Sequence, residues 1–165
     1  MTGVQTCALP IFANIDVGPT LLEVAGLSTP GHMDGRSFWQ LAKGNDIPWR
    51  DFVLYEYFWE RNYPHTPTIH AVRGERFKYI RYHGLWDTNE LYDLQTDPDE
   101  TTNLIFEPEH QETVAKLNKR LFELLAKSGG MNLRLAPDRG PTFPKRHPER
   151  SGPADFPKQF YGTSE

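Results

Sequence analysis

The stretch TIHAVRGERFKYIRYH, Thr68–His83, holds two runs rich in β-branched and aromatic residues on either side of one glycine. Such runs are typical of β-strands, so we expect strands at Thr68–Arg73 and Arg76–His83. Gly74-Glu75 between them predicts a tight hairpin. The second run alternates, with odd-numbered side chains on one face and even-numbered ones on the other. The sheet is therefore expected to be half covered.

Two further runs of the same kind flank this hairpin. FVLYEYFW spans Phe52–Trp59, and NELYDL spans Asn89–Leu94. Both are bounded by polar or glycine-containing turns. Together the runs predict an α+β fold with a small antiparallel sheet of about four strands.

A helix is expected after the sheet. Glu107-Pro108 places proline at a first helical position, and Gly129-Gly130 ends the pattern. The apolar side chains between them recur at helical spacing: Val114, Leu117, Leu121, Leu124 and Leu125. This stripe is expected to lie across one face of the sheet.

Two short helices are expected before the sheet. Asp16 can cap a helix over Val17–Ala25, which presents Leu21 and Leu22 on an apolar side. Arg36–Lys43 predicts a second helix that buries Phe38, Trp39 and Leu41. Both are too short to be stable alone, so they need a partner surface.

The chain divides into four parts by composition. Residues 1–11 resemble the in-frame translation of a sequencing adapter rather than a folded element. The lone Cys7 lies in this segment and is therefore assigned no role. Residues 12–48 carry the two short helices, and residues 49–130 carry the sheet and the long helix. Residues 131–165, rich in proline, are expected to form an extended tail.

Composition excludes several classes of partner. A formal net charge of −4 over 165 residues supplies no broad basic field for nucleic acid. No window approaches the roughly 20 apolar residues of a membrane helix. Neither nucleic acid nor a membrane is therefore an expected partner.

The order of these segments resembles the C-terminal end of bacterial sulfatases in the formylglycine-dependent, alkaline-phosphatase-like superfamily. NIDVGPTLLEVAGL from Asn14 is similar to the last helix of their large α/β domain, and DGRSFW from Asp34 to the bend that leaves it. AVRGERFKYIRYHG (Ala71–Gly84) and ELYDLQTDPDETTNL (Glu90–Leu104) are similar to the smaller C-terminal subdomain. N-acetylglucosamine-6-sulfatase-like enzymes are the relatives that the resemblance suggests.

The resemblance implies hydrolysis of sulfate esters on sulfated sugars, including glycosaminoglycan or mucin-type glycans. A formylglycine attacks sulfur as its hydrate, and a calcium ion offsets charge on the sulfate oxygens. The modification motif is Cys or Ser, any residue, Pro or Ala, any residue, Arg, and the sequence after Cys7 does not match it. We therefore expect no catalytic residue and no metal ligand here, and an inactive chain that depends on its own N-terminal catalytic domain.

Four residues are candidates for substrate binding. His65 lies on a proline-bearing loop that faces the large domain's cleft in the resembled family, and His70 follows in the next strand. Arg73 could pair with an acidic group of the substrate, and Trp86 could stack on a sugar ring. For each of the four, a structural role within the protein is the alternative.

The acidic segment from Asp93 to Glu100 could suggest a calcium loop, but it lacks the glycine and the terminal glutamate of an EF-hand. A turn is the preferred interpretation. Asp97-Pro98 would start it, and Asp99 or Glu100 would cap backbone N–H groups.

Two alternatives to a sulfatase remain. A phosphonate or phosphate ester hydrolase of the same superfamily would differ only at the nucleophile region. A freestanding carbohydrate-binding or interaction module would have a covered surface instead of exposed apolar residues around Leu21, Leu22, Phe38 and Trp39. The family also implies a periplasmic or secreted location.

Overall fold

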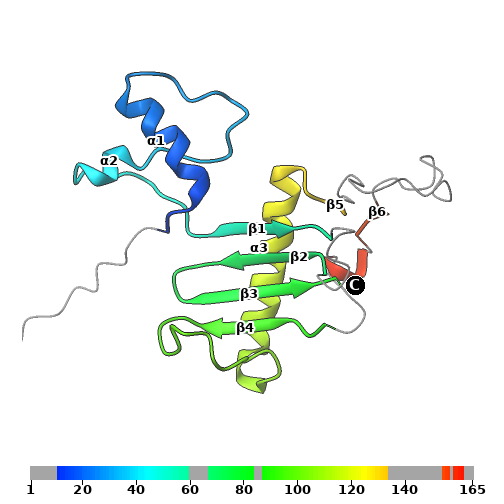
Figure 1. Ribbon diagram of the computed structural model, residues 1–165. Helices are drawn as coiled ribbons and strands as arrows, with labels where there is room; N and C mark the ends of the chain where they lie inside the picture. Colours follow the sequence, from blue (N-terminus) through cyan, green and yellow to red (C-terminus); the bar gives the residue numbers. More distant parts are fainter. Residues whose placement is uncertain (1–10, 60–66, 84–86, 134–153, 157, 162–165) are drawn as a thin grey trace, which may run out of the picture. The chain divides into compact units, whose positions relative to one another are not determined.

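The computed structural model describes residues 11–59, 67–83, 87–133, 154–156 and 158–161 (Figure 1). The chain forms two compact units, residues 1–53 and residues 54–165. Within the described residues, no helix combines the length and the apolar character needed to cross a bilayer.

The first unit contains three short helical segments. They are the 3-10 turn η1 (Asn14–Asp16), α1 (Val17–Val24) and α2 (Trp39–Ala42). Glycines end both helices in the left-handed region, Gly26 at φ 72° and Gly44 at φ 85°. The prediction of two helices is confirmed, although α2 is a single turn, half as long as expected.

Burial in this unit agrees with expectation only in part. Pro19 and Thr20 are the buried residues of α1, whereas Leu21 is 63% exposed, as expected for a chain that lacks its large domain. Phe38, Trp39 and Leu41 are half-buried rather than buried. A unit with only two short helices has too little surface to enclose large side chains on its own.

The second unit is built on a four-stranded antiparallel sheet in the order β1-β2-β3-β4 (Figure 1). The strands are β1 (Val53–Tyr57), β2 (Ile69–Arg73), β3 (Phe77–Tyr82) and β4 (Glu90–Asp93). All four predicted strands are confirmed. The tip of the central hairpin was predicted one residue too early, because the Gly74 N–H donates to the Phe77 carbonyl at 2.9 Å and leaves Glu75 and Arg76 as the tip.

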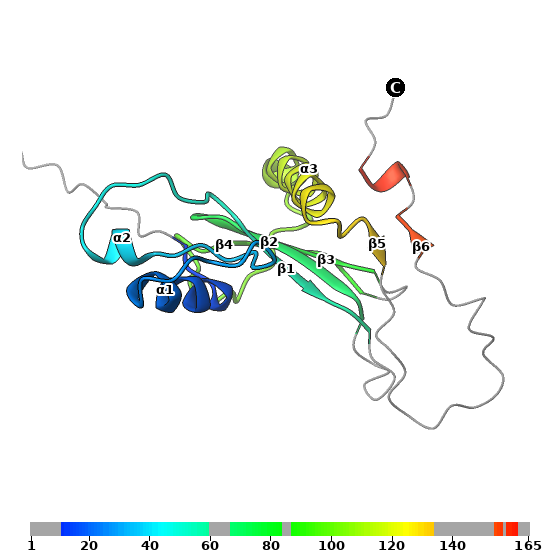
Figure 2. The same cartoon turned by 90° about the horizontal axis from the view of Figure 1, so that it is seen from above.

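One long helix packs on this sheet. The 3-10 turn η2 (Pro108–His110) leads into α3 (Gln111–Ser128), which ends at Gly129 with φ 76°. Figures 1 and 2 show α3 crossing one face of the sheet. The expected helix and its stop at Gly129 are confirmed, but its α-helical part begins at Gln111, after the 3-10 turn that holds Pro108, and Phe122 joins the buried stripe.

The core of the second unit lies between α3 and the sheet. Val72, Tyr79 and Leu91 are opposite one another on β2, β3 and β4 and are 0–1% exposed. Opposite residues of antiparallel strands share a face, and the Tyr79 hydroxyl donates to Asn118 of α3, so this row faces the helix. Buried apolar residues of α3 cover it: Leu117, Leu121, Phe122 and Leu125.

Two short strands complete the second unit. β5 (Asn132–Leu133) pairs with β6 (Ala154–Asp155) in an antiparallel bridge. The 3-10 turn η4 (Lys158–Phe160) follows. The described end of the predicted tail is therefore folded onto the unit, where Phe156 is only 3% exposed.

Candidate functional site

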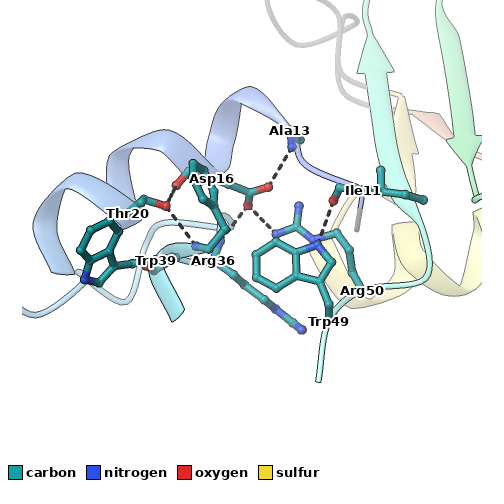
Figure 3. Close-up of polar contacts among 10 residues, drawn as sticks. Ile11, Ala13, Asp16, Thr20, Arg36, Trp39, Trp49 and Arg50 are labelled. Carbon is teal, nitrogen blue, oxygen red and sulfur yellow. Dashed lines mark hydrogen bonds and ion pairs between the residues drawn. The ribbon is translucent and has the colours of Figure 1, made fainter. Parts of the chain in front are cut away.

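The Asp16 carboxylate is the polar centre of the first unit (Figure 3). Its Oδ2 accepts the Ala13 N–H at 2.8 Å, and its Oδ1 accepts the Arg36 N–H at 2.9 Å. The Arg50 guanidinium forms an ion pair with the same Oδ1. Asp16 was expected to cap α1, but it makes no side-chain cap bond there. Its oxygens instead join segments that are far apart in sequence.

Thr20 extends this network one helical turn further along α1. Its hydroxyl donates to the Asp16 carbonyl at 2.7 Å and accepts the Phe38 N–H at 3.1 Å. Nearby, the Trp49 indole N–H donates to the Ile11 carbonyl at 2.9 Å (Figure 3). Because both Asp16 oxygens already bind groups of this chain, the network supports the fold rather than a ligand.

A second polar cluster lies at one end of the sheet. β1 and β3 end there, at Tyr57 and Tyr82, and β2 and β4 begin there, at Ile69 and Glu90. His83 directly follows β3, and its N–H donates to the Thr68 carbonyl at 3.0 Å. The β2–β3 hairpin turn lies at the opposite end of these strands, so the polar cluster and the hairpin turn occupy different ends of the sheet.

Glu56, His70 and His83 form a chain of polar groups at this end. Nδ1 of His70 lies 2.9 Å from Nε2 of His83, and Nε2 of His70 lies 3.6 Å from Oε1 of Glu56. The His70 side chain is fully buried. Phe58 and Phe156 pack edge-on to its ring, with centroids 5.8 Å and 5.5 Å away. A carboxylate thus lies beside a pair of imidazoles with aromatic rings around them, although Nε2 of His70 has no hydrogen-bond partner among the described residues.

Arg81 lies beside this pair, opposite His70 in the β2–β3 register. Its Nη1 donates to Oδ1 of Asn118 at 2.9 Å, and its guanidinium lies 4.3 Å from the centroid of the Phe160 ring. Its Nε is buried and has no hydrogen-bond partner among the described residues. The positive charge of Arg81 thus faces the imidazole pair, and no carboxylate among the described residues forms an ion pair with it.

This environment lowers the pKa of His83 to about 3, from an ordinary value of 6.5. Burial is the main cause, and the neighbouring His70 and the Arg81 charge add to it. His83 is therefore neutral at physiological pH. A neutral imidazole exchanges hydrogen bonds with uncharged groups but attracts a sulfate anion poorly.

Two of the four predicted substrate-binding residues, His70 and Arg73, lie in the described structure. His65 and Trp86 lie outside the described residues. His70 is enclosed by aromatic rings, a position that favours packing over direct contact with a substrate. Arg73 is exposed at the hairpin end of β2, away from the end where His70 begins the strand.

The acidic segment after β4 is a turn, as its sequence indicates. Asp97, rather than Asp99 or Glu100, caps it, because its carboxylate accepts the N–H groups of Thr101 and Thr102 at 3.1 Å and 2.8 Å. These bonds lower the pKa of Asp97. Among the residues with defined positions, no three His, Cys, Asp or Glu side chains are grouped so that they could hold a metal ion.

Sequence reasoning missed Glu56, Arg81 and Asn118 as members of a polar cluster. Arg81 was placed on the correct face with Tyr79, but Asn118 lies between apolar positions of the α3 stripe and gave no separate signal. The hairpin register would have placed Arg81 opposite His70, had the tip been set at Glu75-Arg76. Glu56 could not be found, because its partner is 14 positions along the chain on another strand.

Known proteins resemble this chain in sequence. The family described as N-sulphoglucosamine sulphohydrolase, C-terminal, matches residues 4–127. An N-acetylglucosamine-6-O-sulfatase of Bacteroides thetaiotaomicron is 30% identical over 121 residues, which are 70% of this chain and 20% of that relative. This chain thus spans about a fifth of the length of that relative.

Solved structures resemble it in fold. A protein crystallised with its substrate D-glucosamine-2-N,6-O-disulfate matches with a TM-score of 0.61 and 26% identity, over 69% of this chain and 24% of the other. A phosphonate monoester hydrolase of Agrobacterium radiobacter has a TM-score of 0.57 at 23% identity, over 86% of this chain and 28% of the other, and shows the shared fold alone. Because the family match extends over most of its residues, the chain belongs to the N-sulphoglucosamine sulphohydrolase C-terminal family of the sulfatases.

Proposed function

We propose that this chain is the C-terminal part of a sulfatase that hydrolyses sulfate esters of sulfated sugars, such as those of glycosaminoglycans or mucin-type glycans. One observation carries the proposal: a single family match runs through both units of the chain. The names of the relatives favour an amino sugar that bears sulfate, since one acts on N-acetylglucosamine 6-O-sulfate and another binds D-glucosamine-2-N,6-O-disulfate.

In this proposal the chain supports the active site and does not perform the chemistry. Both carboxylate oxygens of Asp16, the polar centre of its first unit, already accept hydrogen bonds from the chain itself. The second unit is packed around α3. The formylglycine nucleophile and the calcium ion belong to the remainder of the enzyme. The chain alone is then inactive, and the enzyme is exported to the periplasm or beyond.

The proposed partner of the first unit is the enzyme's own catalytic domain. Val17, Leu21 and Val24 recur at helical spacing on α1 and are 49%, 63% and 53% exposed. An apolar stripe of this kind is unfavourable in water and marks a contact surface. Since the chain spans about a fifth of a relative's length, the rest of the same protein is the simplest cover for it.

The test begins with long-read sequencing of the source DNA, which gives the reading frame across Phe12, the residue that follows the adapter-like segment 1–11. The complete protein would be produced together with a formylglycine-generating enzyme and given N-acetylglucosamine 6-sulfate. We expect release of free sulfate, measured by ion chromatography, and none from the 165-residue chain alone. An unmodified variant, with alanine at the formylglycine position, is the control.

Other outcomes would favour the alternatives. Faster turnover of a phosphonate or phosphate monoester than of the sulfate ester would indicate a phosphonate or phosphate ester hydrolase of the same superfamily. A native start codon close to Phe12, with the chain alone binding a sulfated glycan in isothermal titration calorimetry, would indicate a freestanding binding module and would overturn the sulfatase proposal.

A further inference from the structure

The described C-terminal residues dock on the second unit as a separate segment. We call residues 154–156 and 158–161 the C-terminal clasp. It is held at one end by the β5–β6 bridge, where Leu133 pairs with Ala154. At the other end the Phe160 carbonyl accepts the Asn118 side-chain N–H at 3.0 Å. The clasp thus lies against α3 and the end of β3.

Aromatic rings form most of its contact. The Phe156 ring lies 5.1 Å from His83, 5.5 Å from His70 and 5.3 Å from Phe122 of α3, centroid to centroid. Phe160 covers the Arg81 guanidinium, and Tyr161 lies 5.3 Å from Phe122. Because Phe156 packs against both imidazoles, the clasp and the histidine pair share one aromatic contact.

Glu56 decides how the protons are arranged in this pair. A bare His70 Nε2 facing the Glu56 carboxylate at 3.6 Å would be repelled, so this nitrogen carries the proton. Nδ1 of His70 then has a lone pair and must accept the hydrogen bond from Nε2–H of His83. With both rings neutral, Nδ1 of His83 is the only unprotonated nitrogen without a partner inside the pair, and it is the atom that takes up the next proton.

A proton at that atom would be opposed by its surroundings. Among the described residues, the charged and titratable groups that face the pair are Glu56 on β1 and Arg81 on β3; α3 contributes the neutral Asn118 and Phe122. Glu56 is separated from His83 by the His70 ring, whereas Arg81 is on the same strand as His83. From the clasp come two phenyl rings, while Lys158 is exposed. An imidazolium here needs water for its hydration, and the docked Phe156 ring, 5.1 Å from the His83 ring centroid to centroid, leaves less room for that water.

We propose that the C-terminal clasp is acid-sensitive: it stays docked while His83 is neutral, and it lifts to admit water when Nδ1 of His83 takes up a proton. α3 keeps its own contact with the sheet through Leu117, Leu121 and Leu125, so release of the clasp leaves the core in place. The low pKa of the docked His83 agrees with this coupling. Undocking restores an ordinary pKa, and acid therefore favours the undocked state.

Hydrogen exchange measured by mass spectrometry on the full chain tests the proposal. We expect protection of the clasp amides, corrected for the intrinsic exchange rate, to fall about tenfold between about pH 7.5 and about pH 5.5, since each pH unit below the free imidazole pKa adds a factor of ten. Protection of β3 and α3 should persist. In His83→Gln the clasp should respond little to pH, while His110→Gln, which removes a histidine outside the clasp contact, should behave like the wild type.

Three results would overturn the proposal. They are unchanged clasp protection in the wild type at both pH values, an equal loss of protection in His83→Gln, and simultaneous loss in the clasp, β3 and α3. Phe156→Ala provides an independent check if His83→Gln does not fold. It should leave the clasp unprotected at both pH values while α3 stays protected, and a clasp that remains protected in this variant would also contradict the proposal.

Discussion

Asp16 and Arg50 form an ion pair across 34 positions of the chain, with the Asp16 side chain fully buried and that of Arg50 12% exposed. The pair joins the start of α1 to the segment that leads into β1. The same carboxylate also accepts two backbone N–H groups, from Ala13 and Arg36. The first unit, which has little apolar core, thus depends on one side chain.

Asp16→Asn should destabilise the chain by about 3 kcal/mol, because it leaves the Arg50 charge largely buried without its counter-ion. Urea unfolding followed by circular dichroism measures this loss. Asp46→Asn, at an exposed acidic residue, should change the unfolding free energy by less than about 0.5 kcal/mol. A loss as small as that for Asp16→Asn would show that the ion pair is dispensable.

Gly35→Ala should destabilise the first unit through a backbone clash. A Cβ at position 35 would lie 1.9 Å from the Ile15 carbonyl oxygen, far inside van der Waals contact. We expect a loss of at least about 2 kcal/mol, since the overlapping atom is backbone and cannot rotate away. Gly31→Ala is the matched control, because a Cβ there meets nothing within 4 Å. Equal thermal midpoints for the two variants would be inconsistent with the close approach.

Leu121→Ala and Leu124→Ala test the packing of α3. Leu121 is fully buried against the sheet and Leu124 is half-buried, so the first change should cost about 2–5 kcal/mol and the second about 1 kcal/mol. The same denaturation experiment compares them. If both variants lost the same stability, the stripe that faces the sheet would have to be reassigned.

His83 should make the stability of the chain depend on pH. Its pKa is about 3 in the folded chain and close to the ordinary 6.5 when unfolded, so the unfolded state binds more protons between these values. The stabilising contribution is therefore complete above pH 6.5 and is lost progressively as the pH falls toward 3. The free energy of unfolding of the wild type, measured from about pH 7.5 downward, should fall more steeply than that of His83→Gln. Parallel curves would mean that His83 titrates normally.

Much of the second unit was predictable because its signals are local. Gly129 ends α3 in the left-handed region that glycine favours, and the leucine spacing identified the buried stripe. Strand runs were recognisable for the same reason, since β-branched and aromatic residues favour a pleated, half-buried surface. Asp97 was recognised as starting a turn, although neighbouring acidic residues were expected to cap it.

The candidate site was predicted less well, because its members interact across strands. His70, His83 and Glu56 meet only through the register of three strands, and a hairpin tip displaced by one residue is enough to mispair them. Burial around α2 was also misjudged. Phe38, Trp39 and Leu41 were expected to be buried, but the described first unit leaves them half-buried.

The sequence by itself determined where strands, turns and the long helix lie, since these depend on side-chain periodicity and on residues with special backbone freedom. Only the tertiary structure decided that Asp16 binds the Arg36 N–H and the Arg50 guanidinium instead of capping a helix. It also decided that Phe156 packs against both rings of the His70–His83 pair. The physical reason is that a hydrogen bond or a burial energy depends on which atoms meet in space. Residues far apart in the chain meet only after the strands and helices have packed together.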